Sequence, residues 1–264
     1  MASHVDHRPN APLLTALDPP PVTVERPKGR SPFLFIGDHA GNVIPSRLGR
    51  LGLAPEELQR HIAWDIGIAE LGTLLSETMD ATFVRQTYSR LVVDCNRRPD
   101  AVDAMVPVSD ATVVPGNASL SDEARAARLA ALHDPYHRAI AAEIVRRQAD
   151  GRTTVMIALH SFTPSLADGK VRPWHVGVLH DRGDQSFALA LIDEFRRDVA
   201  LVVGDNEPYR MDLIDYTVPR HCYPDRLPYA ELEVRQDLIG DDEGQRRWAA
   251  RLAEALDRVI AGRA

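Results

Sequence analysis

Short apolar runs alternate with helical patterns along most of this chain, and this alternation restricts the fold more than any other feature. Apolar runs typical of buried strands occupy residues 33–37, 81–86, 90–94, 153–159, 174–180, 201–203 and 229–234. Helical patterns occupy residues 55–78, 121–149, 184–197 and 242–261, and the second is expected to break near Pro135. Helices between strands predict an α/β fold with a mainly parallel sheet that is covered on both faces.

The first 32 residues differ from the rest. They contain seven prolines and no periodic apolar face, and such a segment resists both helix and sheet. We interpret residues 1–32 as an extended proline-rich arm and residues 33–264 as a single α/β/α hydrolase domain. Residues 99–120 form a long irregular connection, and loops of this length are often functional.

The composition argues against several classes of protein. With 31 Lys and Arg against 38 Asp and Glu, the net charge of -7 does not suit broad nucleic-acid binding. No apolar run approaches the roughly 20 residues of a membrane-spanning helix, and the N-terminus lacks a secretory pattern. The two cysteines, Cys95 and Cys222, do not make a disulfide framework. We expect a cytoplasmic protein with a small-molecule partner; the oligomeric state is not determined by the sequence.

Four short polar stretches stand where predicted strands end. They are 38–42 (Asp-His-Ala-Gly-Asn), 94–97 (Asp-Cys-Asn-Arg), 159–162 (Leu-His-Ser-Phe) and 231–237 (Glu-Leu-Glu-Val-Arg-Gln-Asp). Ligands of open α/β sheets bind at the carboxyl ends of the strands, so we expect these stretches to converge. They supply two histidines, an Asn-Arg pair and a carboxylate, which are the groups that zinc-dependent hydrolysis of an amide next to a carboxylate needs.

His39 and His160 are the predicted metal ligands. Each is more often structural when it stands alone, but two histidines at strand ends favour a metal site, although the spacing lacks a dense ligand motif. A catalytic zinc has three protein ligands and an open position for water. We choose Asp65 as the third, because the neutral amide of Asn42 binds zinc poorly. The alternative for Asp65 is a helix-related carboxylate with no metal.

Glu233 is the predicted general base. Alternation along its strand puts Glu231, Glu233 and Arg235 on one face of the sheet. A carboxylate there is able to take a proton from activated water. Glu231 competes for this role, and a structural pairing of Glu233 with Arg235 is the alternative.

Asn96, Arg97 and Arg90 are the predicted substrate contacts. An arginine fork binds both oxygens of a carboxylate, which favours Arg97 as the anchor and Arg90 as a second candidate. The alternative is that Arg97 pairs with a structural acid such as Asp94 or Asp100.

His221 lies in a predicted polar loop and is a candidate for an oxyanion or substrate contact, with a structural role as the equal alternative. Of the other histidines, His175 and His180 are interpreted as structural. We expect His61, His133 and His137 to lie on helices with no evident partner. A covalent mechanism is disfavoured, because no Gly-x-Ser-x-Gly elbow is present.

Between about residues 33 and 239 the chain resembles the N-formylglutamate amidohydrolase family. The matching pieces are Asp38-His39-Ala40-Gly41-Asn42 with Pro45, the segment 88–97, Leu159-His160-Ser161-Phe162-Thr163-Pro164 and the segment 233–238. The resemblance implies a three-layer α/β/α sandwich around a mixed sheet, phosphorylase/hydrolase-like and similar to zinc carboxypeptidases. It also implies that His39 and His160 bind one zinc ion, that Asn96 and Arg97 hold substrate, and that Glu233 is the base. The departure is Asn42, where carboxypeptidases have a ligand glutamate.

The leading hypothesis is therefore a zinc-dependent amidohydrolase that cleaves an N-formyl or N-acyl amino acid such as N-formylglutamate. A peptidase, or a hydrolase of other acyl amino acids, would use the same residues. A non-catalytic binding protein that has lost the metal because of Asn42 is the third reading.

Overall fold

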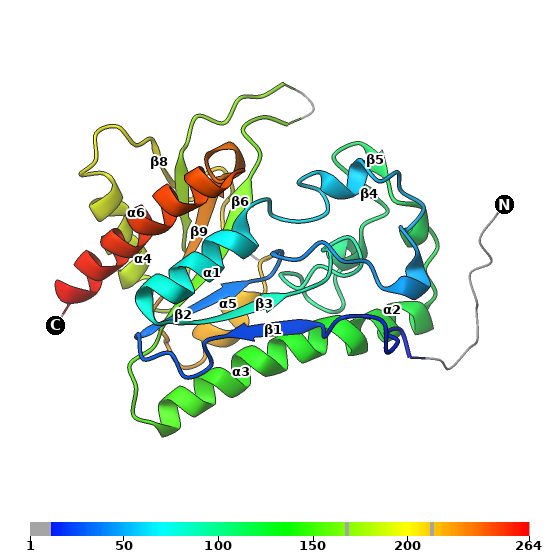
Figure 1. Ribbon diagram of the computed structural model, residues 1–264, viewed down its shortest axis with the longest axis horizontal. Helices are drawn as coiled ribbons and strands as arrows, with labels where there is room; N and C mark the ends of the chain where they lie inside the picture. Colours follow the sequence, from blue (N-terminus) through cyan, green and yellow to red (C-terminus); the bar gives the residue numbers. More distant parts are fainter. Residues whose placement is uncertain (1–11, 167–168, 212–213, 264) are drawn as a thin grey trace.

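A seven-stranded mixed sheet forms the centre of the protein (Figure 1). The computed structural model describes residues 12–166, 169–211 and 214–263. The strands lie in the order β1-β3-β2-β6-β9-β7-β8. Their bounds are Val22–Glu25 (β1), Phe33–Gly37 (β2), Thr82–Gln86 (β3), Val155–Phe162 (β6), Val176–Leu179 (β7), Val203–Asp205 (β8) and Tyr229–Arg235 (β9). Strands β3, β2, β6 and β9 are parallel, whereas β1 and β7 run antiparallel to β3 and β9. The predicted α/β fold with a mainly parallel mixed sheet is confirmed.

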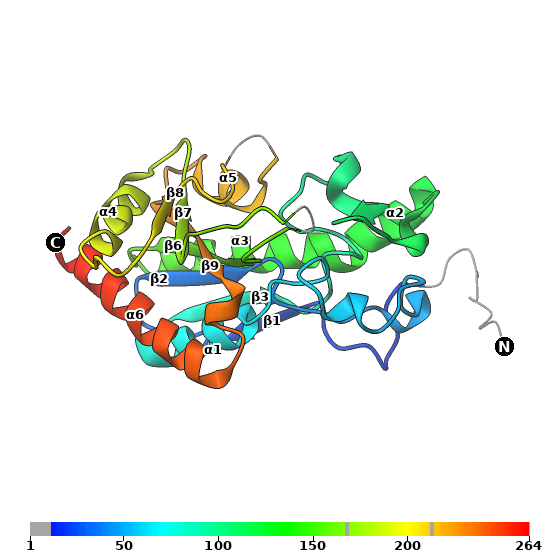
Figure 2. The same cartoon turned by 90° about the horizontal axis from the view of Figure 1, so that it is seen from above.

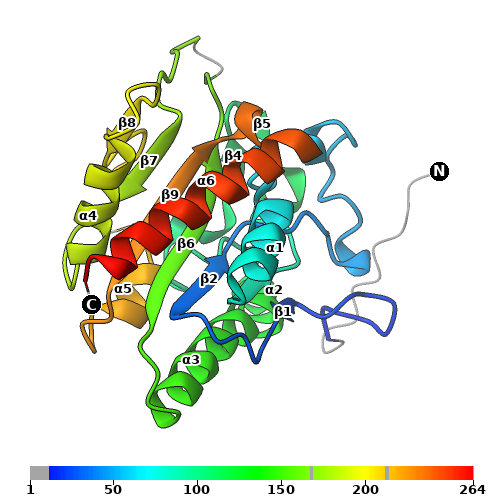
Figure 3. The ribbon, with the colours of Figure 1, turned by 60° about the vertical axis from the view of Figure 1, so that its left-hand side comes forward.

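Helices cover both faces of the sheet (Figure 2). On one face lie α1 (Ile68–Met79), α4 (Ser186–Phe195) and α6 (Asp242–Ala261), and Figure 3 shows α1 and α6 side by side. The other face carries α3 (Asp134–Ala149) and α5 (Thr217–Cys222). Each face of the sheet has its own hydrophobic core, and β2 contributes to both because successive side chains of a strand point to opposite faces. Phe33 and Phe35 pack under α1 and α4, while Leu34 and Ile36 face α3.

Segments that follow β2 and β3 form a third packed region beside the sheet. It contains α2 (Asp122–Arg128) and a small hairpin of β4 (Val108–Ser109) and β5 (Thr112–Val113). Buried apolar side chains such as Leu51, Leu91 and Leu132 hold it together. No helix in the described ranges combines the length and hydropathy needed to cross a membrane.

The predicted helix at residues 55–78 is wrong in its first half, because the helix begins at Ile68. Gly67 has a φ of 82°, a left-handed conformation that interrupts a right-handed helix. The N–H of Asp65 donates to the carbonyl of His39 at 2.9 Å. This backbone hydrogen bond places two of the predicted metal ligands, His39 and Asp65, next to each other.

The predicted strand at residues 90–94 is also wrong, and the segment is a series of turns. The Ser89 hydroxyl accepts from the N–H of Leu91 at 3.2 Å, and the Asp94 carboxylate accepts from the N–H of Asn96 at 2.9 Å. Short polar side chains that bond to the nearby backbone stabilise turns, and here they outweigh the β propensity of the apolar run.

The proline-rich arm contributes a strand to the sheet. β1 pairs with β3, so the expectation that the arm resists sheet formation is wrong for Val22–Glu25. The strand lies at the edge of the sheet, between Pro21 and Pro27, where a residue without an N–H is tolerated. Residues 1–11 of the arm lie outside the described residues, and the division of the chain at residue 32 stays an interpretation.

The predicted break near Pro135 is a π-helical turn over Leu129–His133 that joins α2 to α3. Pro135 lies in the first turn of α3, where its missing N–H is no loss. Residues 217–222, predicted as loop, form the short helix α5. The side-chain oxygen of Asn96 accepts the N–H groups of Tyr216 and Thr217, both at 2.9 Å, and so satisfies donors at the start of this helix.

Candidate functional site

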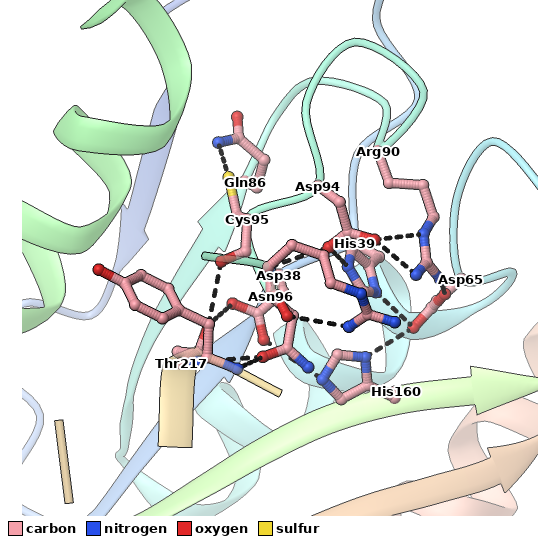
Figure 4. Close-up of polar contacts among 12 residues, drawn as sticks. Asp38, His39, Asp65, Gln86, Arg90, Asp94, Cys95, Asn96, His160 and Thr217 are labelled. Atoms are coloured by element: carbon pink, nitrogen blue, oxygen red, sulfur yellow. Dashed lines mark hydrogen bonds and ion pairs between the residues drawn. The ribbon is translucent and has the colours of Figure 1, made fainter. Parts of the chain in front are cut away.

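Three buried side chains, His39, Asp65 and His160, meet at the carboxyl end of the central strands (Figure 4). One ligand atom from each lies within 4.8 Å of the other two. The Asp65 Oδ2 is 2.9 Å from the Nδ1 of His160 and 3.5 Å from the Nδ1 of His39. The structure thus brings together the three side chains that the sequence nominates as metal ligands.

The local fold explains this meeting. His39 follows β2 directly, and His160 lies near the end of the neighbouring strand β6. Gly41 lets the chain turn closely past β3, because a Cβ at this position would lie 2.1 Å from the carbonyl group of Thr87. The third candidate ligand, Asp65, reaches the site through its backbone bond to His39.

The donor set fits a zinc ion. The Nδ1 of His39 is buried and has no hydrogen-bond partner among the described residues. Two imidazole nitrogens and a carboxylate oxygen are a ligand set that catalytic zinc sites use. The Asn42 amide instead donates to the carbonyl of Leu58 at 2.5 Å, so the geometry favours Asp65 over Asn42 as the third ligand.

Each imidazole also faces a second carboxylate on its far side. The Nε2 of His39 is 2.7 Å from Asp94 Oδ1, and the Nε2 of His160 is 3.3 Å from Asp38 Oδ2. Metal-binding histidines commonly donate their other N–H to a carboxylate, which fixes the tautomer and the ring orientation. Sequence reasoning missed this role for Asp38 and Asp94, although both belong to the polar stretches at predicted strand ends.

Arg90 is engaged by the protein's own carboxylates and also lines the cavity beside them, so its predicted contact with substrate stays a prediction. Its Nη2 donates to Asp94 Oδ2 at 2.6 Å, and its Nη1 is 3.5 Å from Asp65 Oδ1. Burial alone would raise the pKa of Asp94, but Arg90 and then His39 outweigh it and hold that pKa well below its ordinary value. Burial would also raise the pKa of Asp65, but His39 and then His160 hold that pKa below its ordinary value, so both carboxylates are ionised.

Glu231 and Glu233 extend from β9 toward the same site. The pairing of β6 with β9 places Glu233 opposite His160, and both glutamates line the cavity. Burial raises the pKa of Glu233 to about 8, whereas the positive charge of a protonated His160 acts in the opposite direction. Within the described part of the chain, the Oε2 atoms of both glutamates are buried without a hydrogen-bond partner. A bound dication would lower the pKa of Glu233 toward the range of an effective base.

The cavity in front of these groups has a volume of about 180 Å³. A second cavity of about 210 Å³ shares four of its lining residues, which are His61, Arg90, Arg97 and Tyr209. This space suits a small molecule, and three cationic side chains, Arg90, Arg97 and Arg210, line the first cavity.

Asn96 and Arg97 both line the cavity, as the sequence predicts. Asn96 is fixed by α5 and by Asp215, to which its Nδ2 donates at 3.2 Å. Arg97 pairs through Nε with the half-exposed Asp103 at 2.9 Å, and its Nη1 is 3.7 Å from Asp215 Oδ1; neither Asp94 nor Asp100 forms this pair. A partly exposed ion pair contributes little, so an incoming carboxylate competes with Asp103 for Arg97 at small cost.

His221 is not among the residues that line the cavity, and the geometry does not support its predicted contact with substrate. It is buried on α5, 3.0 Å from the Nδ1 of His137. His137 in turn bonds to the carbonyl of Cys95 at 2.9 Å, and His133 bonds to the carbonyl of Arg97 at 3.1 Å. The expectation that His133 and His137 lack partners is therefore wrong: they hold the backbone on either side of Asn96.

This histidine cluster predicts a loss of stability in acid. Burial first of all lowers the pKa of His137 to about 3 and that of His221 to about 4. Both are neutral in the folded protein at pH 5, whereas the unfolded chain protonates them below about pH 6.5. Their contribution to the free energy of unfolding is fully present above pH 6.5 and is lost as the pH falls toward 4. At pH 5 the free energy of unfolding is lower by about 2 kcal/mol for each histidine.

Urea unfolding at pH 7 and pH 5 measures this loss, and His221→Gln is expected to reduce the difference between the two pH values. An equal pH dependence in this variant and the unsubstituted protein would contradict the assignment to His221.

An α/β sandwich with a buried His-Asp-His cluster beside two glutamates is an arrangement that hydrolases use to activate water. The family model of N-formylglutamate amidohydrolase matches residues 31–240. The chain therefore belongs to the N-formylglutamate amidohydrolase family, as its motifs indicate, and is an amidohydrolase.

The chain is also similar to individual proteins. The chain is 27% identical over 248 residues to an N-formylglutamate deformylase from Pseudomonas aeruginosa, covering 88% of this chain and 91% of the relative. The solved structure of gene product Atu2144 from Agrobacterium tumefaciens is 36% identical, with a TM-score of 0.91 over 95% of this chain and 98% of that one. An N-formylglutamate amidohydrolase from Ralstonia eutropha shares the fold, with a TM-score of 0.61, 19% identity and coverage of 90% and 98%.

Proposed function

We propose that this protein is a zinc-dependent amidohydrolase that removes the acyl group from an N-formyl amino acid, with N-formylglutamate as its substrate. The observation that carries this proposal is the buried His39-Asp65-His160 cluster beside Glu233, in which the Nδ1 of His39 has no hydrogen-bond partner among the described residues. Membership of an amidohydrolase family and similarity to an N-formylglutamate deformylase support the choice of substrate.

His39, Asp65 and His160 would hold the ion. When bound, zinc supplies Lewis acidity that lowers the pKa of a water molecule and polarises the amide carbonyl. Asp94 and Asp38 orient the two imidazoles through their far nitrogens. Arg90 pairs with Asp94, keeps it ionised, and lies 3.5 Å from Asp65.

Glu233 accepts the proton of the attacking water and delivers it to the nitrogen of the leaving amine. The products are formate and the free amino acid. Arg97 anchors the substrate carboxylate by displacing Asp103, and the fixed side chain of Asn96 borders the bound amide. Burial of Glu233 raises its affinity for a proton, which suits a group that must both accept and donate one.

The test measures metal content and formate release on the same preparation. We expect about one zinc ion per chain, release of formate from N-formyl-L-glutamate, loss of activity after chelation and its return with zinc. Faster cleavage of short peptides than of N-formyl-L-glutamate would overturn the choice of substrate in favour of a peptidase. Absence of both metal and turnover would indicate a binding protein.

A further inference from the structure

Arg172 lies beside the cavity and takes no part in the reaction described above. Arg172 lies in the segment between β6 and β7, where its backbone N–H donates to the carbonyl of Pro164 at 2.9 Å. Only 7% of the residue is exposed. Its guanidinium lies against the rings of Phe162 and Tyr209, with centroids at 5.9 and 4.8 Å. Phe162 and Tyr209 line the first cavity, and Arg172, which is not itself a lining residue, adjoins it through these two rings.

Among the described residues, no carboxylate lies within ion-pair distance of Arg172. Within the described ranges, its hydrogen-bond acceptors are the Tyr209 hydroxyl at 2.9 Å and the carbonyl of Thr163 at 3.5 Å, and Nη1 donates to both. Of the other buried arginines, Arg147 pairs with Glu143 at 2.7 Å. Arg128 also has no carboxylate within ion-pair distance in the described part of the chain, but it donates to three oxygen atoms, the backbone carbonyls of Val92 and Gly116 and the side-chain amide of Asn117.

A buried cation with neither a counter-ion nor enough hydrogen-bond acceptors is costly, so a negatively charged ligand group beside Arg172 would be stabilised. The hydroxyl of Tyr209 accepts from Arg172, so its own proton remains available to an acceptor. Burial, and then the charge of Glu233, raise the pKa of Tyr209, which keeps this proton on the phenol. Tyr209 lines the same cavity as Glu233 and Arg90.

We propose that Arg172 and Tyr209 bind a second carboxylate of the substrate, the one on its side chain, and so select acidic over neutral N-formyl amino acids. The proposal rests on the proposed function and assigns Arg97 and Arg172 to the two ends of a dicarboxylate. Hydrogen bonds to charged groups contribute about 1.5–3 kcal/mol, which corresponds to roughly 10- to 100-fold in affinity.

The test compares N-formyl-L-glutamate with N-formyl-L-norvaline, which lacks the side-chain carboxylate. Arg172→Gln should raise KM for the acidic substrate about 10- to 100-fold and leave KM for the neutral one within about threefold. Arg172→Lys should restore part of the loss, because it keeps the charge but not the fork. Arg98→Gln is the matched control, since Arg98 is exposed, pairs with Asp100 and does not line the cavity.

Calorimetric binding of glutarate and butyrate gives a readout that does not depend on turnover. Arg172→Gln should weaken glutarate about 10- to 100-fold and leave butyrate unchanged. Tyr209→Phe removes only the hydroxyl and should weaken glutarate about fivefold, which keeps the test valid if Arg172→Gln fails to fold.

Equal losses for acidic and neutral ligands, or no loss for glutarate in Arg172→Gln and Tyr209→Phe, would overturn the assignment. If the unsubstituted protein releases no formate from either substrate, the proposed function fails, while glutarate binding still decides the role of Arg172.

Discussion

Replacing Glu233 by glutamine is expected to lower kcat for N-formyl-L-glutamate by about a thousand-fold. A positioned general acid–base contributes roughly 10²- to 10⁴-fold, and glutamine keeps the shape of the side chain while it loses the ability to take the proton. Glu233 is not among the three candidate ligands, so the metal content should stay at that of the unsubstituted protein. Steady-state formate release and metal analysis of the same samples provide the measurement.

Glu231→Gln is the matched control for this experiment. Glu231 is on the same face of β9, is equally buried and also lines the cavity, but the register puts Glu233 rather than Glu231 opposite His160. We expect a much smaller fall in kcat for Glu231→Gln. Should Glu231→Gln lose as much as Glu233→Gln or more, the base would have to be reassigned to Glu231.

Replacing His160 by glutamine is expected to remove the metal and with it the activity. The affinity for zinc should fall by more than 100-fold, because even the partners behind a ligand account for about 10- to 100-fold. Zinc analysis after gel filtration should find well below one ion per chain. The same experiment on Asp65→Asn tests the third ligand, for which the sequence left Asn42 as the rival.

His175→Gln is the matched control, because the substitution is the same but the site is different. His175 accepts a backbone hydrogen bond from Val202 at 2.9 Å and does not belong to the candidate ligand cluster. It should retain both zinc and turnover. Full zinc occupancy in His160→Gln would show that the ion, if bound, is held elsewhere.

Local patterns were sufficient for most of the fold. The apolar runs at β2, β3 and β6 and the helical pattern of α6 are long enough to show their period, and the structure has them within a few residues of the prediction. Prediction was wrong where side chains bond to a nearby or distant backbone. Examples are the turns held by Ser89 and Asp94, and the start of α5, whose donors are satisfied by Asn96.

The candidate site, too, could be predicted from the sequence only in part. His39 and His160 could be nominated from the sequence because each stands at the end of a strand, and parallel strands bring such ends to one edge. The engagement of Arg90 and the pairing of His137 with His221 could not be nominated. Those contacts join side chains whose approach depends on how loops and helices pack.

The sequence by itself determined the alternation of strands and helices, the family, and the chemical types of the groups at the strand ends. These properties depend on residue type and local period, which are written in order along the chain. Only the tertiary structure decided which imidazole nitrogen faces Asp65, that Arg90 is already paired with Asp94, and that Arg172 is buried against Tyr209. The reason is physical: hydrogen bonds and ion pairs act over about 3 Å, and such proximity between distant segments exists only after the chain has packed.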